Sequence, residues 1–201
     1  MTSKHLILFL ITTLFYGAHS LLLHPPFKRF IINKLSLNLK IYRIAYNVFS
    51  TLFLLMIFLY SQTIRDQVFI DSTYIKLLAL LFFFGGILLL YKSFKRYDLK
   101  EFIGLRAESE NTLQDTLVVD GLHKLVRHPV YTATIFILLG YFLYSPTYKS
   151  AIIMLTSYIY LPLGILLEER KLTDKFGESY LKYKSKVPKL FPNIFRKKAR
   201  E

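Results

Sequence analysis

The chain has 201 residues, of which 53% are hydrophobic and 20% charged, and its mean hydropathy is +0.37. It is more apolar and less charged than an average soluble domain. The absence of cysteine excludes disulfides, thiolate metal sites and a cysteine nucleophile. A net charge of +14 would indicate a nucleic-acid partner for a soluble protein, but in so apolar a chain it favours anionic lipid headgroups. We therefore expect a lipid bilayer as partner and no nucleic acid.

Apolar residues gather in five runs. Three of them carry almost no charge and approach the roughly 20 residues that cross a bilayer: His5–Leu23, Ile41–Ser61 and Tyr74–Tyr91. Val130–Tyr144 and Ala151–Leu167 form a predicted helical hairpin, because Pro146 between them cannot continue a helix interior. The sequence therefore predicts an all-α, polytopic integral membrane protein with five transmembrane helices and a cytoplasmic C-terminal helical segment.

The first run also resembles a signal peptide, since Ala18-His19-Ser20 follows the apolar stretch as a cleavage site would. However, His19 is large for such a site, and the apolar residues continue through Leu23 until Pro25-Pro26 stops them. We therefore favour a retained first helix.

Lys and Arg are divided unevenly between the two sides of the predicted membrane. Five follow the first run as far as Arg43, seven lie between the third and fourth runs, and eleven follow the fifth, against four elsewhere. Lys and Arg accumulate in cytoplasmic loops. The split predicts an inner-membrane protein with its N-terminus outside and its C-terminus in the cytoplasm.

A single membrane domain is predicted over residues 1–201. It comprises a three-helix N-terminal half (5–94), a cytoplasmic connector (95–128), and a helical hairpin with a C-terminal segment (129–192). Polar residues gather in Lys92–His128 and after Leu167, both cytoplasmic in this topology. An active site there would meet a water-soluble cofactor from one side and a lipophilic substrate from the other.

The usual motifs of soluble enzymes are missing. The sequence has no GxGxxG, glycine-rich phosphate loop, HExxH or GxSxG motif. Five histidines are present, none at metal-ligand spacing from another histidine or a carboxylate, so no metal site is expected: His5, His19, His24, His123 and His128.

Two short segments carry candidate chemistry. Pro129 suits the first turn of a helix, where free N–H groups and Arg127 would form an anion site; a plain helix start with a snorkelling arginine is the alternative. Glu168 and Glu169 follow a long apolar run and would hold an ammonium or a ribose, or simply mark the helix leaving the membrane. A turn at Gly177 and a short amphipathic helix follow, with Tyr180 and Tyr183 facing lipid.

In combination these segments resemble the isoprenylcysteine carboxyl methyltransferase superfamily of membrane methyltransferases. The resemblance rests on Arg-His-Pro-x-Tyr at 127–131, the Glu-Glu pair at 168–169, and Phe-Gly-x-x-Tyr-x-x-Tyr-x-x-x-Val-Pro at 176–188. In the N-terminal half, His19-Ser20, Pro26–Arg29, Tyr97–Leu99 and Phe102–Arg106 resemble the NnrU-type branch, which includes methanethiol S-methyltransferases.

The resemblance implies S-adenosylmethionine as methyl donor, in a cytoplasmic pocket of the last two helices and the C-terminal segment. The implied cofactor-binding residues are Val118, Val119, Gly121, Leu122, Arg127, His128, Pro129, Val130, Tyr131, Glu168 and Glu169. Arg106 and His19 are the candidate substrate residues, and the thiol proton would pass to water or to His128.

The expected acceptor is a small or lipophilic thiol. Prenylcysteine enzymes carry an arginine for the acceptor's carboxylate four residues before the Glu-Glu pair, whereas this chain has Gly164 there. The alternatives are a prenylcysteine carboxyl or lipid methyltransferase, a relative of the sterol reductases, and a non-enzymatic NnrU-type membrane accessory protein.

Overall fold

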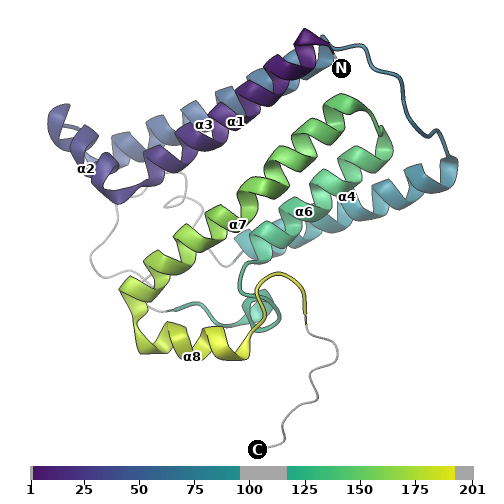
Figure 1. Cartoon of the computed structure of the whole chain (residues 1–201). Coiled ribbons are helices and arrows are strands. Elements are labelled where there is room, and N and C mark those ends of the chain that lie inside the picture. Colours follow the sequence, from purple (N-terminus) through teal and green to yellow (C-terminus); the bar gives the residue numbers. More distant parts are fainter. Residues whose placement is uncertain (1, 96–116, 193–201) are drawn as a thin grey trace, which may run out of the picture.

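The computed structural model describes residues 2–95 and 117–192, and every regular element in these ranges is a helix (Figure 1). The elements are α1 (Ser3–Leu23), α2 (Pro25–Lys34), α3 (Leu39–Gln62), α4 (Thr73–Phe94), the 3-10 turn η2 (Gly121–Lys124), α6 (Pro129–Tyr144), α7 (Tyr148–Phe176) and α8 (Glu178–Lys186). The predicted all-α class is thus confirmed for the described ranges.

Four of these helices, α1, α3, α4 and α7, are long and apolar enough to cross a membrane. Large apolar side chains point outward from them: Leu81 is 70% exposed and Ile159 76%. A soluble protein rarely exposes so large an apolar surface, whereas lipid covers it at no cost. The fourth predicted segment corresponds to α6, which has 16 residues and spans about 24 Å, less than the roughly 30 Å of hydrocarbon.

The long helices pack in the order α3, α1, α7, α6, α4 (Figure 1). Chain segments alternate between the two ends of this bundle. The N-terminus of α1, the α3–α4 connection and the α6–α7 turn lie at one end, and α2 and α8 lie at the other. The predicted hairpin with its turn at Pro146 is therefore present.

Helices α4 and α6 approach closely because small residues line their contact. Ala79, Gly86 and Ser93 are the buried residues of α4 and are spaced seven apart. A Cβ atom added to Gly86 would lie 2.9 Å from the carbonyl oxygen of Ala133, and one added to Gly140 would lie 2.7 Å from that of Ala79. Backbone therefore packs directly on backbone, as small residues allow between membrane helices.

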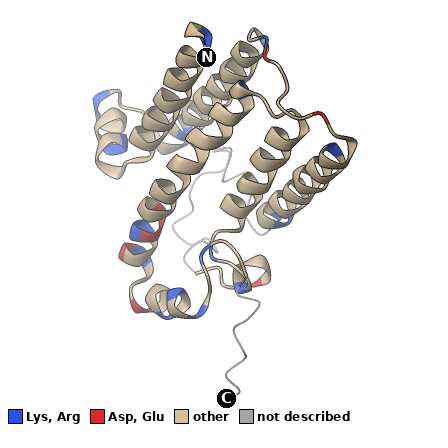
Figure 2. Cartoon of the chain, turned by 45° about the vertical axis from the view of Figure 1, so that its right-hand side comes forward, with Lys and Arg blue, Asp and Glu red and all other residues tan. Residues whose placement is uncertain are grey.

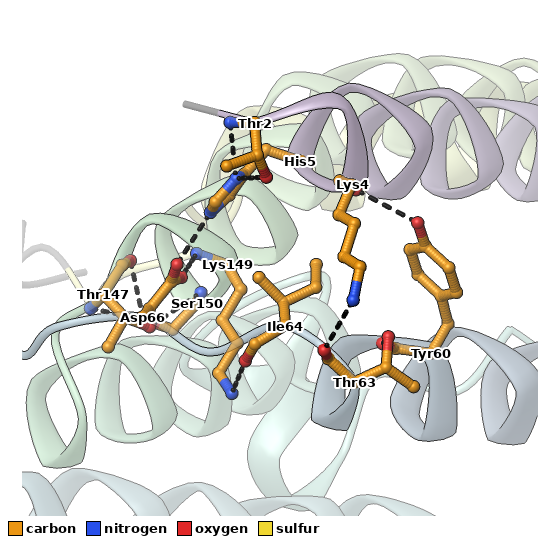
Figure 3. A network of polar contacts seen from close by, with 10 residues as sticks. All are labelled: Thr2, Lys4, His5, Tyr60, Thr63, Ile64, Asp66, Thr147, Lys149 and Ser150. Atoms are coloured by element: carbon orange, nitrogen blue, oxygen red, sulfur yellow. Dashed lines mark hydrogen bonds and ion pairs between the residues drawn. The ribbon is translucent and has the colours of Figure 1, made fainter.

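At the end of the bundle that contains the N-terminus, Asp66 of the α3–α4 connection joins three segments (Figure 3). Its Oδ1 accepts a hydrogen bond from His5 Nε2 of α1 at 2.8 Å, and its Oδ2 accepts one from the Lys149 amide of α7 at 2.9 Å. The Thr2 amide donates to His5 Nδ1, so the imidazole proton lies on the nitrogen that faces Asp66. Both carboxylate oxygens of Asp66 and both ring nitrogens of His5 are thus hydrogen-bonded within the protein.

The opposite end of the bundle carries most of the described Lys and Arg residues, among them those of α2, α8 and the C-terminal part of α7 (Figure 2). Helix α2 is not expected from the sequence, which indicates only a basic connection after Pro25-Pro26. The two prolines end α1 and also occupy the first positions of α2, where a missing N–H costs nothing.

The turn at Gly177 and the helix after it are confirmed: Gly177 has φ +52° and α8 follows. The predicted lipid exposure of Tyr180 and Tyr183 is wrong. They are 1% and 9% exposed, and the Tyr183 hydroxyl donates to the His123 carbonyl at 2.7 Å. This face of α8 is apolar because it packs on the segment before α6.

Two adjacent glycines of α4 test the close packing. A Cβ at Gly86 would lie 2.7–2.9 Å from atoms of α6, whereas one at Gly85 would meet nothing within 4 Å. We expect Gly86→Ala to lower the free energy of unfolding in detergent by about 1–3 kcal/mol. Gly85→Ala should leave it unchanged or raise it, because alanine favours helix. Equal thermal midpoints for the two variants would contradict the packing.

Candidate functional site

A cavity of about 330 Å³ lies between α1, α6 and α7, toward the end of the bundle that carries α2 and α8. Its volume falls in the usual range for small-molecule sites. The lining residues come from the α1–α2 junction (His19, Ser20, Leu23, His24), the first turns of α6 (Val130, Tyr131, Thr134) and one face of α7 (Tyr160, Leu161, Gly164, Leu167, Glu168, Lys171).

Hydroxyl groups hold the α1 wall of the cavity in place. The Tyr46 hydroxyl of α3 lies 2.9 Å from both ring nitrogens of His19, and Ser20 Oγ lies 2.7 Å from the Tyr160 hydroxyl of α7. One turn earlier, the Tyr16 hydroxyl donates to Ser157 Oγ, and its ring stacks on Tyr160 at 4.3 Å. The wall contributed by α1 is therefore fixed to both α3 and α7.

The two adjacent glutamates have different surroundings. Glu168 lines the cavity, and its side chain is 44% exposed. The Glu169 side chain is 6% exposed and accepts from Arg127 Nη2 at 2.7 Å, with Lys184 Nζ 2.7 Å from its other oxygen. Residues one apart on a helix point about 100° away from each other, so only one of the pair faces the cavity.

Arg127 connects the start of α6 to the end of α8. Besides Glu169, it donates to the carbonyl oxygens of Lys184 at 3.0 Å and Val187 at 2.5 Å. The amide of Arg127 donates to the Pro188 carbonyl and that of His128 to the Lys189 carbonyl. These two amides are therefore already hydrogen-bonded within the protein. The Val130 and Tyr131 amides, in the first turn of α6, have no intrahelical acceptor.

His128 is buried behind the cavity wall between the two glutamates. Its Nε2 lies 3.2 Å from Glu169 Oε1, and its Nδ1 lies 3.6 Å from Glu168 Oε2. The neighbouring Tyr180 hydroxyl is buried as well. Burial, together with the negative charge of Glu169, raises the pKa of Tyr180 to about 12. The phenol thus keeps its proton at physiological pH.

The predicted site residues fall into four groups. Val130, Tyr131, Glu168 and His19 line the cavity. Arg127, His128, Pro129 and Glu169 lie next to it at the start of α6 and on α7. Val118, Val119, Gly121 and Leu122 lie in or before η2 and are not among the lining residues. Arg106 is outside the described residues.

Sequence reasoning missed Tyr160, Leu161 and Lys171, which share the cavity face of α7 with Glu168. They lie eight, seven and three residues from Glu168, and this was the available signal, because positions at such spacings lie on one helix face. No cluster of metal-ligating side chains occurs in the part of the chain that the structure describes.

The cavity lining therefore combines one carboxylate, one ammonium that donates to a carbonyl oxygen, the first turn of α6 and an otherwise mostly apolar wall. The amides of this turn and the positive end of the α6 dipole favour an anionic group, and Glu168 favours a cationic one. The arrangement suits a molecule that carries both charges on an apolar body.

Comparison with known proteins identifies relatives along nearly the whole chain. The model of a family described as "NnrU protein" matches residues 7–191. The chain is 30% identical to methanethiol S-methyltransferase of Pseudomonas deceptionensis, over 93% of this chain and 72% of that protein. It is 27% identical to methanethiol S-methyltransferase 2 of Bradyrhizobium diazoefficiens, over 94% of this chain and 73% of that protein. No solved structure shows a significant match.

The buried pair of Arg127 and Glu169 can be tested through stability. Glu169→Gln leaves the Arg127 charge buried without its counter-charge, and we expect it to lower the free energy of unfolding in detergent by about 3–5 kcal/mol. Glu168→Gln is the matched control, since the same change at a half-exposed neighbour should cost far less. The pairing would be contradicted if both variants unfolded at the same denaturant concentration.

Proposed function

The chain belongs to the NnrU family, and we propose that it is an integral-membrane methyltransferase that uses S-adenosylmethionine to methylate a small thiol such as methanethiol. The observation that carries the proposal is the cavity, whose lining combines Glu168, the first turn of α6 and uncharged residues of α1. Relatives named methanethiol S-methyltransferase, at 27–30% identity over most of the chain, support the choice of acceptor.

The described residues fit the proposed cofactor. When bound, S-adenosylmethionine would supply a methyl group on a positively charged sulfur. Glu168 would pair with the ammonium or the ribose of this molecule, and the Val130 and Tyr131 amides would donate to its carboxylate. Leu161 and Leu167 on α7 would exclude water from the reacting atoms, so that positioning and desolvation supply much of the rate.

We further propose an indirect role for the residues behind the cavity wall. Arg127, His128 and Glu169 form one hydrogen-bonded group, and Pro129 begins α6 beside them. By fixing the start of α6 against α7 and α8, this group would hold Tyr131 and Glu168 in their relative positions. Contacts of Val118, Val119, Gly121 and Leu122 with the cofactor stay a prediction.

The cavity favours a neutral acceptor over a carboxylate. Gly164 is part of its wall, and a Cβ there would lie 3.2 Å from the Tyr131 hydroxyl, so the position has little room for a cationic side chain. Lys171 is the single Lys or Arg among the lining residues, and its Nζ donates to the Leu23 carbonyl at 3.0 Å. A buried carboxylate without a cationic partner would be costly, whereas a thiol needs none.

For the membrane we propose five crossings, with α6 as the fourth, in the inner membrane. The N-terminus would lie outside, and α2, α8 and the active site would face the cytoplasm. The support is the alternation of chain segments between the bundle ends (Figure 1) and the gathering of Lys and Arg at one of them (Figure 2).

Reporter fusions test this orientation. A reporter after Arg200 should indicate the cytoplasm, and one inserted near Gln67 should indicate the opposite side, because three proposed crossings, α4, α6 and α7, separate the two positions. Identical locations for the two reporters would refute the five-crossing topology.

The proposed reaction is tested with purified protein and methyl-labelled S-adenosylmethionine. We expect labelled thioether from methanethiol and no labelled ester from N-acetyl-farnesylcysteine, because the cavity offers no free cation to the carboxylate. Methylation of the farnesylcysteine alone would make the chain a carboxyl methyltransferase.

The cofactor role of Glu168 is tested in the same preparation by calorimetry with S-adenosylhomocysteine. Glu168→Gln keeps the shape of the side chain and removes its charge, so binding should weaken by about 1–3 kcal/mol. Glu178→Gln, an acidic residue in the first turn of α8 and not among the cavity-lining residues, is the control. Equal affinities for the two variants would reject Glu168 as a ligand.

A further inference from the structure

We infer that His19 of α1 is the group that accepts the proton of the acceptor thiol. The inference rests on the proposed function, since it concerns the same cavity and the same reaction. An alkyl thiol has a pKa of about 8.5 or above, and an apolar cavity disfavours the thiolate further. A proton acceptor inside the cavity would therefore raise the fraction of reactive sulfur.

Six titratable residues line the cavity, and four of them are poor acceptors or are assigned to another role, while the fifth is open to solvent. Tyr131 and Tyr160 are phenols, which are protonated at neutral pH, and Lys171 is a cation bound to a carbonyl oxygen. Glu168 is assigned to the positively charged or ribose part of the cofactor. His24 is exposed at the junction of α1 and α2.

His128, the base considered from the sequence, is placed differently from His19. It is 3% exposed, lies between the two glutamates, and is not among the residues that line the cavity. His19 is among the residues that line the cavity, and it comes from α1, whereas Glu168 comes from α7. A thiol held between the α1 wall and the cofactor would therefore meet His19 and not His128.

The surroundings of His19 suit a neutral imidazole that takes up a proton. Histidine is the side chain that changes charge near physiological pH, so it can be neutral and still take up a proton during a reaction. The Tyr46 hydroxyl lies 2.9 Å from each ring nitrogen, and Ser50 Oγ lies 3.5 Å from Nδ1. One oxygen can align with only one of the two ring nitrogens, and Ser50 lies on the Nδ1 side. We therefore place the imidazole proton on Nδ1, so that the lone pair of Nε2 accepts the thiol proton. Tyr46 is thus a positioning residue for His19.

The proton and electron balance of the step is complete. The thiol sulfur forms its bond to the methyl carbon as the bond between that carbon and the donor sulfur breaks, and the electron pair stays on the donor sulfur. The proton of the thiol passes to the free nitrogen of His19. The resulting imidazolium then loses the proton to water at the cytoplasmic side, so the products are a neutral thioether, neutral S-adenosylhomocysteine and one proton.

Thiols of different acidity test the inference. An alkanethiol needs its proton removed during the reaction, whereas thiophenol is far more acidic and is largely ionised before it reacts. We expect His19→Asn, which keeps a polar group near Tyr46 but cannot act as a base, to lower kcat for the alkanethiol by about 10²–10⁴-fold. The kcat for thiophenol should change little.

Two measurements separate this role from packing. Binding of S-adenosylhomocysteine to His19→Asn should equal that of the wild type, which shows that the variant is folded. Ser20→Ala removes the neighbouring hydroxyl that contacts Tyr160 and cannot affect proton transfer by an imidazole, so it should change kcat for both thiols by the same factor.

The measurements distinguish failure of the proposed role of His19 from failure of the proposed function. An equal loss for both thiols in His19→Asn, or no loss for either, would overturn the role of His19 while leaving the proposed function intact. Failure of the proposed function would appear in the wild-type protein, as an absence of S-adenosylhomocysteine binding and of methylation of either thiol.

Discussion

The ion pair between Arg127 and Glu169 holds together three parts of the chain that are far apart in sequence. Arg127 precedes α6, Glu169 lies near the end of α7, and the carbonyl oxygens of Lys184 and Val187, which Arg127 also binds, end α8. Burying two charges costs more free energy of hydration than one contact between them restores. The additional hydrogen bonds to carbonyl oxygens and to Lys184 offset this loss, and the same bonds fix where α6 begins.

A similar arrangement stabilises the other end of the bundle. There the buried carboxylate of Asp66 joins the beginnings of α1 and α7 (Figure 3). Between the two ends, small residues bring α4 and α6 together, and hydroxyl groups join α1 to α7. Polar bonds therefore define the ends and the cavity, and van der Waals packing supports the rest, as expected where lipid offers no hydrogen bonds.

The sequence predicts the long helices well because hydropathy and proline positions are local signals. The hairpin at Pro146, the helix start at Pro129 and the turn at Gly177 are all present. Helix α2 was missed because Pro25-Pro26 was interpreted only as the end of the first helix, whereas the same two prolines also begin the next one. The burial of Tyr180 was missed because a sequence pattern cannot distinguish lipid from a neighbouring protein segment as the partner of an apolar face.

The sequence predicted the residue types of the candidate site, but it did not predict which of these side chains face the cavity. Glu168 and Glu169 are equivalent in a motif, and only the position of Arg127 in space decides which one faces the cavity. The presence of His19 and Glu168 in the lining of one cavity depends on the packing of α1 on α7, which no local pattern encodes. Tyr160 and Lys171 follow from helical periodicity once the cavity face of α7 is known.

The shortness of α6 has a consequence for the bilayer itself. It has six residues fewer than α4 beside it, a difference of about 9 Å in length. Lipid adapts to such hydrophobic mismatch by local thinning, and in the proposed orientation the headgroups and water would then dip toward Pro129. A polar nucleoside could thereby meet a volatile sulfur compound dissolved in the acyl chains, without either of them leaving the phase in which it is soluble.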